Sequence, residues 1–420
     1  MARPLRRGSG HDERRRTTRE LIVFTACLLV FLAYLVEERL RLGRALRRIP
    51  LRIAVSGTRG KSGVTRLIAA GLREAGARVV AKTTGSRPRL ILPDGTEEDV
   101  SRPGGNPSIR EQIRVVGRAA GMKAEALVAE MMSIGEECLF TESRRIVRPG
   151  ILALTNVRLD HLDAMGRRKN DIARMLSAAF PEGATVFFPK EESYSIFGET
   201  AARTASRLHP VDPPAAVEGH GEGAPLPFGE FEPNVRLALA VLGSLGVGRD
   251  MALRGMGRAV PDFGRLRVWK AEFGAPPRTA LCVSAFAAND PESSAAVLEK
   301  IRAMLPAGPK SLLGLLCLRE DRGDRTLQWL RAAGAGFFVD FERVAVVGKP
   351  ARAAARKLRK ARGLAVEKFS FFPDPRPAEL MDRLLSLARH DPVLVGLGNI
   401  VGPGEGFVRH WETTGTPYGC

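Results

Sequence analysis

The chain has 420 residues, of which 44% are hydrophobic, and it carries a formal net charge of +19. Such a chain can bury ordinary hydrophobic cores, which excludes disorder of the whole chain and predicts two globular domains with additional segments. The sequence contains neither a basic stripe interleaved with aromatic residues nor zinc-finger spacing, so we expect no nucleic-acid partner despite the positive charge. The five cysteines are scattered without a Cys-x-x-Cys pair, which is typical of a reduced, cytosolic environment.

The N-terminal region, residues 1–48, is rich in arginine and contains an uncharged apolar run at residues 21–36. A helix of that run spans about 24 Å, slightly less than a hydrocarbon core of about 30 Å, so flanking side chains would have to snorkel. We expect a single-pass anchor in the cell membrane with the catalytic domains in the cytoplasm. A cleaved signal peptide is the alternative, but no small-x-small cleavage site follows the run. Arginines flank the run on both sides, so the positive-inside rule leaves the side of the N-terminal arm open.

The next segment, residues 53–65, is an apolar strand that runs into a glycine turn and then into a helix. Gly57 and Gly60 allow the backbone amides to face phosphate oxygens, and the N-terminus of the helix favours the same negative charge. Lys61 would reach the β- and γ-phosphates of a nucleotide, and Ser62 would bind Mg²⁺. The loop predicted to bind the nucleotide comprises Gly57, Thr58, Arg59, Gly60, Lys61, Ser62 and Gly63.

Apolar strands alternate with helical segments from residue 51 to about 189, which indicates βαβ units around a mostly parallel sheet. Residues 203–233 are rich in Pro and Gly and predict an irregular excursion, followed by a helix over about 234–245. A second α/β series begins near residue 279. The sequence therefore predicts an α/β protein with a central domain at 49–267 and a Rossmann-like C-terminal domain at 268–420.

Two segments of the central domain supply candidate metal ligands. Glu130 ends an apolar strand, which places its carboxylate at the edge of the sheet where ligands collect. A second strand ends at Thr155-Asn156 and is followed by Asp160, His161 and Asp163. Carboxylates and neutral imidazole are suitable donors for a divalent ion beside phosphates.

With these motifs in place, the chain resembles the Mur ligase superfamily, and most closely the family of poly-γ-glutamate synthase ligase subunits, PgsB/CapB. The resemblance runs from about residue 49 to about residue 406 and also includes the N-terminal apolar segment. It rests on GTRGKSGVTRLI (57–68), AKTTGSRPRLI (81–91), RPGGNPSIREQ (102–112), VAEMM (128–132), TNVRLDHLDAMG (155–166), PNVRLALAVLGSLG (233–246), AFAANDPESS (285–294), REDRGDRTLQW (319–329) and GLGNIVGPGEG (396–406).

The resemblance implies a P-loop, Mur-ligase-like central domain and ATP-dependent amide ligation through an acyl phosphate, with glutamate and growing poly-γ-glutamate as substrates. It implies two Mg²⁺ ions, one held by Ser62 and Glu130 and a second held partly by His161, with Lys61, Glu130 and His161 as catalytic residues. Asn234 would contact adenine, and either Arg265 or Arg267 would be the arginine at the domain junction. Its candidate substrate residues are Lys82, Thr83, Thr84, Asn289, Asp290, Asp321, Arg322 and Arg325. Its expected partners are a small multi-span membrane subunit and a secreted or anchored subunit of a capsule synthase complex.

The sequence also departs from the wider superfamily. Many Mur ligases carry a modified lysine about fifteen residues beyond the histidine, whereas residues 174–177 contain none. The precursor-binding domain of peptidoglycan ligases has no counterpart, and the apolar segment takes its place. Two alternatives stay open: another amino-acid ligase of the folylpolyglutamate type, and a membrane-tethered P-loop ATPase or scaffold that forms no bond.

Overall fold

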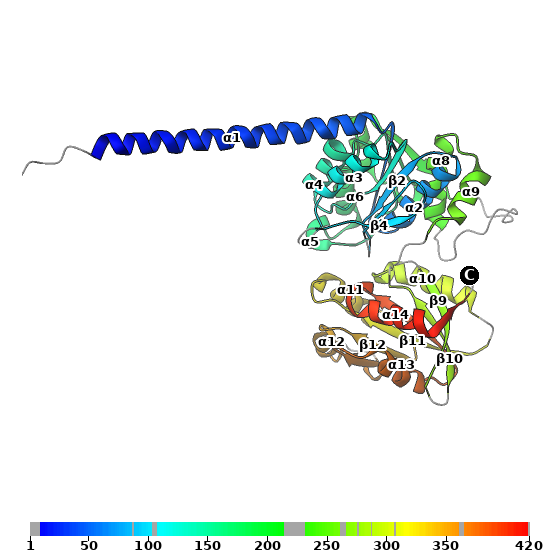
Figure 1. The fold of residues 1–420 in the computed structure, drawn as a ribbon. Coiled ribbons are helices and arrows are strands. Elements are labelled where there is room, and N and C mark those ends of the chain that lie inside the picture. Colours follow the sequence, from blue (N-terminus) through cyan, green and yellow to red (C-terminus); the bar gives the residue numbers. More distant parts are fainter. Residues whose placement is uncertain are drawn as a thin grey trace, which may run out of the picture.

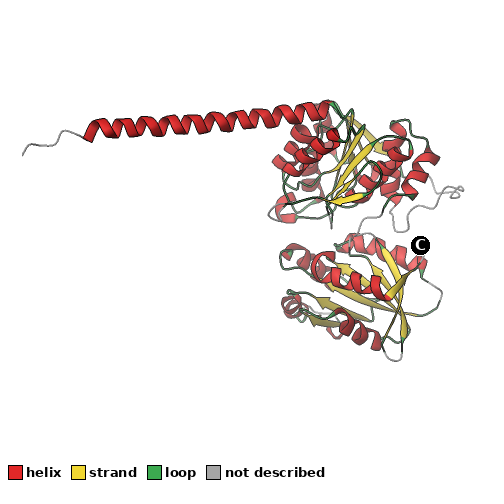
Figure 2. Ribbon diagram, viewed as in Figure 1, coloured by secondary structure: helices red, strands yellow, loops and turns green. Residues whose placement is uncertain are grey.

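The structure is a computed structural model that describes residues 9–85, 88–102, 107–213, 232–260, 266–274, 277–286, 288–305, 308–360 and 365–418. Two α/β units follow one long helix, and helices flank the sheet of each unit (Figures 1 and 2). The prediction of an α/β protein with two mostly parallel sheets is confirmed.

The first unit contains an eight-stranded sheet with the order β4-β3-β2-β5-β1-β6-β7-β8. All neighbouring strands are parallel except the pairs β2–β3 and β3–β4. Its central strands are almost wholly apolar because both faces of the sheet are covered. The strands are β1 (Leu51–Ser56), β2 (Val79–Thr83), β3 (Arg89–Ile91), β4 (Glu97–Asp99), β5 (Ala126–Glu130), β6 (Ile151–Leu154), β7 (Thr185–Pro189) and β8 (Arg207–Val211).

The packing of α2 on the first sheet positions the predicted phosphate loop (residues 57–63), which begins where β1 ends. In α2, apolar residues at helical spacing, Val64, Leu67 and Ile68, are buried in one core with Ile53 of β1. This packing fixes the N-terminus of α2 directly after the loop. The helices are α2 (Lys61–Glu74), α3 (Arg110–Gly121), α4 (Glu136–Phe140), the π-helical η1 (Thr141–Val147), α5 (Leu162–Met165), α6 (Lys169–Ser177), the short η2 (Lys190–Glu192), α7 (Ser195–Thr204), α8 (Glu232–Ser244) and α9 (Arg249–Gly257).

The second unit contains a seven-stranded sheet with the order β13-β12-β11-β14-β10-β9-β15, in which β9 pairs antiparallel with both β10 and β15. Its strands are β9 (Arg267–Phe273), β10 (Arg278–Ser284), β11 (Lys310–Cys317), β12 (Arg343–Val347), β13 (Phe369–Phe372), β14 (Asp391–Gly398) and β15 (Gly415–Pro417). Its helices are α10 (Pro291–Met304), α11 (Gly323–Gly334), α12 (Ala351–Leu358), η3 (Val366–Lys368), α13 (Pro377–Ser386), η4 (Ile400–Gly404) and α14 (Glu405–Thr414).

The Pro/Gly-rich segment differs in part from the expected irregular excursion. Residues 207–211 form strand β8, because their apolar members pair in parallel with β7 at the edge of the sheet. Residues 214–231 lie outside the described residues. The domain boundary at residue 268 stays a prediction, and the first strand of the second sheet begins at Arg267.

The N-terminal helix α1 (Ser9–Arg47) is continuous from the arginine-rich region to the first sheet, and it projects from the first unit (Figure 1). Its stretch from Arg19 to Arg47 has a mean hydropathy of 2.2 in its most apolar part, none of which is buried. By length and composition, this helix can cross a membrane.

The C-terminal end of α1 is part of the folded unit rather than a tether. Leu46 and Ile49 are buried in a core with residues of α3, and Arg52 donates to the Leu46 carbonyl at 3.2 Å. Arg110 of α3 donates to Glu38 Oε1 at 2.6 Å. The domain boundary expected after residue 48 therefore leaves Leu46, which is buried in the core of the first unit, on the N-terminal side.

We predict that a chain beginning at Glu37 is soluble and binds ATP with the stability of the full domain. A chain beginning at Arg48 should be less stable by about 2–4 kcal/mol, because it lacks the buried Leu46 side chain. Urea unfolding of both shortened chains measures the difference. Equal unfolding midpoints would show that the end of α1 does not stabilise the domain.

Candidate active site

The phosphate loop is a tight backbone turn between β1 and α2. Gly57 and Gly60 have φ angles of 118° and 78°, which favour glycine. A Cβ atom at Gly57 would lie 2.2 Å from Thr155 Oγ1, and one at Gly60 would lie 2.5 Å from Asn234 Oδ1. Both glycines are therefore required by conformation and by space, and the loop packs closely against the end of β6 and against α8.

Asn156, directly after β6, holds the loop through both its side chain and its backbone. Its Oδ1 accepts from Thr58 Oγ1 at 2.8 Å and from the Arg59 amide at 3.0 Å, while its carbonyl accepts from the Thr58 amide at 3.1 Å. The sequence analysis placed this asparagine at a strand end without giving it a role. In the structure it fixes the conformation of the phosphate loop.

Lys61 lies within the turn of this loop. Its Nζ donates to the carbonyls of Gly57 at 2.7 Å and Thr58 at 3.3 Å. Burial lowers the pKa of Lys61, while the nearby carboxylates of Glu130 and Asp160 act in the opposite direction. The ammonium therefore sits beside the amides that would face phosphate oxygens, and a bound phosphate would compete with the two carbonyls for it.

Ser62 and Glu130 come together as the sequence analysis expected. Ser62 Oγ donates to Glu130 Oε2 at 2.8 Å, and the Thr84 amide donates to the same oxygen at 2.7 Å. Adjacent ligands of an octahedral Mg²⁺ site, with bonds of 2.0–2.1 Å, lie about 2.9 Å apart. The hydroxyl and carboxylate oxygens therefore have the chemistry and the spacing of two neighbouring ligands of one Mg²⁺ ion.

His161 has a different environment from the one expected for a metal ligand. Its ring nitrogens lie 3.0 Å and 3.3 Å from Arg322 Nη1. Burial, together with Arg322 and Arg325, lowers the pKa of His161 to about 4, although Asp160 opposes the shift. The imidazole is therefore neutral near pH 7, as a metal ligand must be. Among the described residues, no group of three or more His, Cys, Asp and Glu could hold a metal ion, so the second metal stays a prediction.

Asp160 and Arg59 connect the phosphate loop to the second unit. Arg59 lies 3.0 Å from Asp290 Oδ2 and 3.3 Å from Asp160 Oδ2. Arg325 donates to Asp160 Oδ1 at 2.6 Å and to Asn399 Oδ1 at 3.2 Å. Although burial would raise the pKa of Asp160, Arg59 and Arg325 together hold it below its ordinary value. The structure thus brings Asp290, Arg322 and Arg325 to the first unit.

The other described candidates of the second unit pair with residues of their own unit. Asp321 is exposed and pairs with its neighbour Arg319 at 2.6 Å. Asn289 contributes its carbonyl to Trp329 Nε1 at 3.2 Å. Arg267 pairs with Glu412 and lies over the Trp269 ring, while Arg265 lies outside the described residues. The choice of junction arginine therefore stays open.

In the Lys82-Thr83-Thr84 segment, the first two residues are buried and the third is half-buried. Lys82 and Thr83 are fully buried, and Lys82 Nζ pairs with Glu111 Oε2 at 3.4 Å. Thr84 reaches the site through its backbone amide. This segment bonds Glu130 through the Thr84 amide, and contacts of Lys82, Thr83 and Thr84 with substrate stay a prediction.

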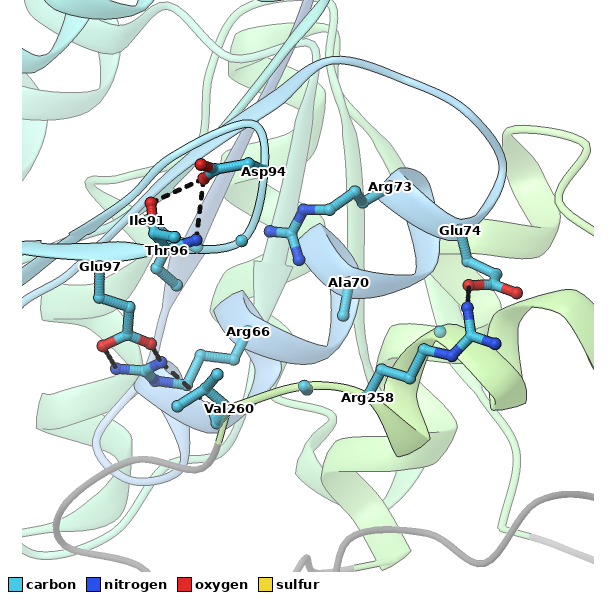
Figure 3. Close-up of a pocket in the computed structure, with 13 residues that line it drawn as sticks. Arg66, Ala70, Arg73, Glu74, Ile91, Asp94, Thr96, Glu97, Arg258 and Val260 are labelled. Carbon is cyan, nitrogen blue, oxygen red and sulfur yellow. Dashed lines mark hydrogen bonds and ion pairs between the residues drawn. The ribbon is translucent and has the colours of Figure 1, made fainter.

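A cavity of about 790 Å³ lies beside residues 66–74 of α2, between the β3–β4 hairpin and α9 (Figure 3). Its lining contains two ion pairs, Arg66 with Glu97, and Arg258 with Glu74 at 2.7 Å. Arg66 also donates to the Val260 carbonyl at 3.1 Å. The phosphate-loop residues 57–63 are not among those that line it, so this cavity is separate from the site above.

Comparisons with known proteins match both units. The family described as the Mur ligase middle domain matches residues 55–206, and the family described as the poly-gamma-glutamate synthase CapB C-terminal domain matches residues 271–414. The capsule biosynthesis protein CapB of Bacillus anthracis is 28% identical over 92% of this chain and 82% of its own length. The PGA synthase CapB of Bacillus subtilis is 27% identical over 92% of this chain and 96% of its own length.

Solved structures share the fold at lower identity. Escherichia coli FolC, in complex with DHPP and ADP, has a TM-score of 0.63 and 18% identity, covering 90% of this chain and 91% of its own. MurF from Acinetobacter baumannii has a TM-score of 0.63 and 16% identity, covering 90% of this chain and 79% of its own. These likenesses concern the fold alone.

We predict that Lys61→Ala lowers ATP turnover at least about 100-fold, because the variant loses the positive charge beside the phosphates. The two bonds of Lys61 to loop carbonyls make a modest loss of stability an additional expected result. Phosphate release and thermal unfolding measure the two effects. Lys190→Ala is the matched control, since Lys190 pairs with Asp212 at the surface. Near-normal turnover by folded Lys61→Ala protein would contradict the role of the loop.

Proposed function

Because the chain belongs to the Mur ligase superfamily and carries a C-terminal domain of the poly-γ-glutamate synthase CapB type, we propose that it joins glutamate units into poly-γ-glutamate. The reaction is an ATP-dependent amide ligation. The observation that carries the proposal is the phosphate loop with the Ser62–Glu130 contact, facing charged residues of the second unit.

The reaction proceeds in two steps, phosphorylation of a carboxylate and its displacement by an amine. A carboxylate oxygen of glutamate attacks the γ-phosphorus of ATP, ADP leaves, and an acyl phosphate forms. The amine of the second substrate then attacks the acyl carbon, the C–O bond breaks, and inorganic phosphate and a proton leave. Activation of the γ-carboxylate would give a side-chain amide and leave each α-carboxylate free.

The residues of the chain act mainly by position and charge, as is usual in phosphoryl transfer. Lys61 neutralises charge on the transferred phosphoryl group, and the loop amides orient it. Ser62 and Glu130 would hold one Mg²⁺ ion, and His161 would contribute to a second; bound Mg²⁺ neutralises phosphate charge. Arg322 and Arg325, positioned by His161 and Asp160, bring positive charge to the side from which an anionic acceptor would approach.

The proposal includes a membrane anchor formed by α1. An exposed apolar helix that ends packed on the catalytic unit would hold that unit at the cytoplasmic surface of the cell membrane. A small multi-span subunit and a secreted or anchored subunit would then export the polymer. The net charge of +19 suits a polyanionic product.

We predict that Glu130→Gln and His161→Ala alter Mg²⁺ dependence differently. Glu130→Gln should raise the Mg²⁺ midpoint of ATP turnover at least about tenfold, because it removes a ligand charge beside Ser62. His161→Ala should lower turnover with a smaller change in midpoint, because it affects only the second ion. Glu137→Gln, at an exposed glutamate, is the control. If His161→Ala changes neither quantity, His161 is a structural residue only.

We predict that the full chain with its membrane partners converts ATP and glutamate into ADP, phosphate and an anionic polymer. Mass spectrometry should give a repeat of one glutamyl residue, and NMR should give the γ-linkage. An α-linked product, or phosphate release that depends on another acid or amine, would favour the folylpolyglutamate-type or other ligase alternative. Phosphate release that depends on no acceptor would favour the ATPase alternative.

A further inference from the structure

The first turn of α3 places three consecutive side chains in three different environments. Arg110 contacts α1 through Glu38, and Glu111 contacts Lys82 under the site. Gln112 is fully buried, and its Nε2 donates to the Glu130 carbonyl at 2.9 Å and to Glu142 Oε1 at 2.7 Å. The first turn of α3 therefore contacts the backbone of Glu130, which ends β5 at the proposed metal-binding edge of the sheet.

Glu142 is a fully buried carboxylate with donors on both oxygens. Besides Gln112, it accepts from the Met132 amide at 3.0 Å, the Ser133 amide at 3.0 Å and Ser133 Oγ at 2.6 Å. It is the second residue of η1, a π-helical segment, and π-helical turns are frequent at functional sites. Since a buried carboxylate is costly without such donors, these contacts fix the chain where it leaves β5.

The backbone around Glu130 is consequently held from both sides. The Met131 amide donates to Val55 of β1 at 2.9 Å, and the next two amides donate to Glu142. The Glu130 carbonyl accepts from Gln112. The Glu130 carboxylate can therefore remain beside Ser62 Oγ without a rearrangement of its main chain.

Charged groups of both signs lie close together around Glu130 and Glu142. Burial lowers the pKa of Lys82, and Glu111, Glu142 and Glu130 oppose the shift, so one ammonium lies near three carboxylates. Arg102 also pairs with Glu111, at 2.8 Å. Lys61 is a second ammonium near Glu130 and Glu142, so the positive groups match the carboxylates in number.

We propose that Gln112 and Glu142 are positioning residues that fix Glu130 for metal binding together with Ser62. The inference rests on the proposed Mg²⁺ site of the ligase. Neither side chain touches the loop or a substrate, and both act through the backbone that carries Glu130. Outer-shell partners of this kind typically change metal affinity about 10- to 100-fold when removed.

Two near-isosteric variants of the full chain in detergent test the proposal. Glu142→Gln keeps the size but places an amide NH₂ against groups that are already donors, and Gln112→Met removes the donor that binds the Glu130 carbonyl. Metal binding is measured by electron paramagnetic resonance of Mn²⁺ in the presence of ADP, and the Mg²⁺ midpoint of ATP turnover is measured alongside. Each variant should weaken Mn²⁺ binding and raise the Mg²⁺ midpoint by at least about tenfold.

Ser143→Ala is the matched control, because Ser143 is buried on the same segment η1 but donates to the Ala179 carbonyl at 2.6 Å, away from β5. It should lower the unfolding midpoint while leaving Mn²⁺ affinity within twofold. Folded Gln112→Met or Glu142→Gln protein with unchanged Mn²⁺ affinity would overturn the proposal, and so would an equal loss in Ser143→Ala. Mn²⁺ binding does not depend on which acid or amine is joined, so a wrong product assignment would leave this test decisive.

Discussion

The structure depends on the close contact between the phosphate loop and the end of β6. A loop that presents amides to phosphate carries unsatisfied donors and strained φ angles, so it must be held by its surroundings. Asn156 does this with hydrogen bonds to Thr58 and Arg59, and the space beside Gly57 is filled by Thr155. Because β1 and β6 are adjacent parallel strands, the sheet itself brings these two segments together. The residues that follow β6, Asp160 and His161, are thereby also placed near Lys61.

The contact between the two units uses the same segment. Arg59 belongs to the phosphate loop, yet it pairs with Asp160 of its own unit and with Asp290 of the other. Arg325 pairs with Asp160 from the opposite side. A buried charge cluster of this kind costs desolvation, and its partners must all be present to offset that cost. The position of the second unit and the conformation of the loop are therefore linked through Asp160.

The part of the site that the sequence predicts is the part that local motifs encode. Gly57, Gly60, Lys61 and Ser62 are recognised by spacing, and Glu130 by its place at the end of an apolar strand. Gln112 and Glu142 escaped prediction because a single polar residue on a helix has no local pattern that distinguishes burial from exposure. The burial of Lys82 was not predicted either, because it depends on the contact with Glu111 of α3, which no local rule reveals. Strand β8 was missed because its pairing with β7 outweighs its proline and polar residues.

The first turn of α3 contacts both the C-terminal part of α1 and the residues around Glu130, and this gives α1 a structural role. Arg110 binds Glu38 on α1, while the next two residues of α3 reach Lys82 and Glu130. Tyr34, within the apolar run, lies 3.4 Å from Arg110, so α3 begins at the level where that run ends. A helix that is continuous through this contact holds the end of β5 in a fixed relation to the apolar segment of α1, which a flexible linker could not do.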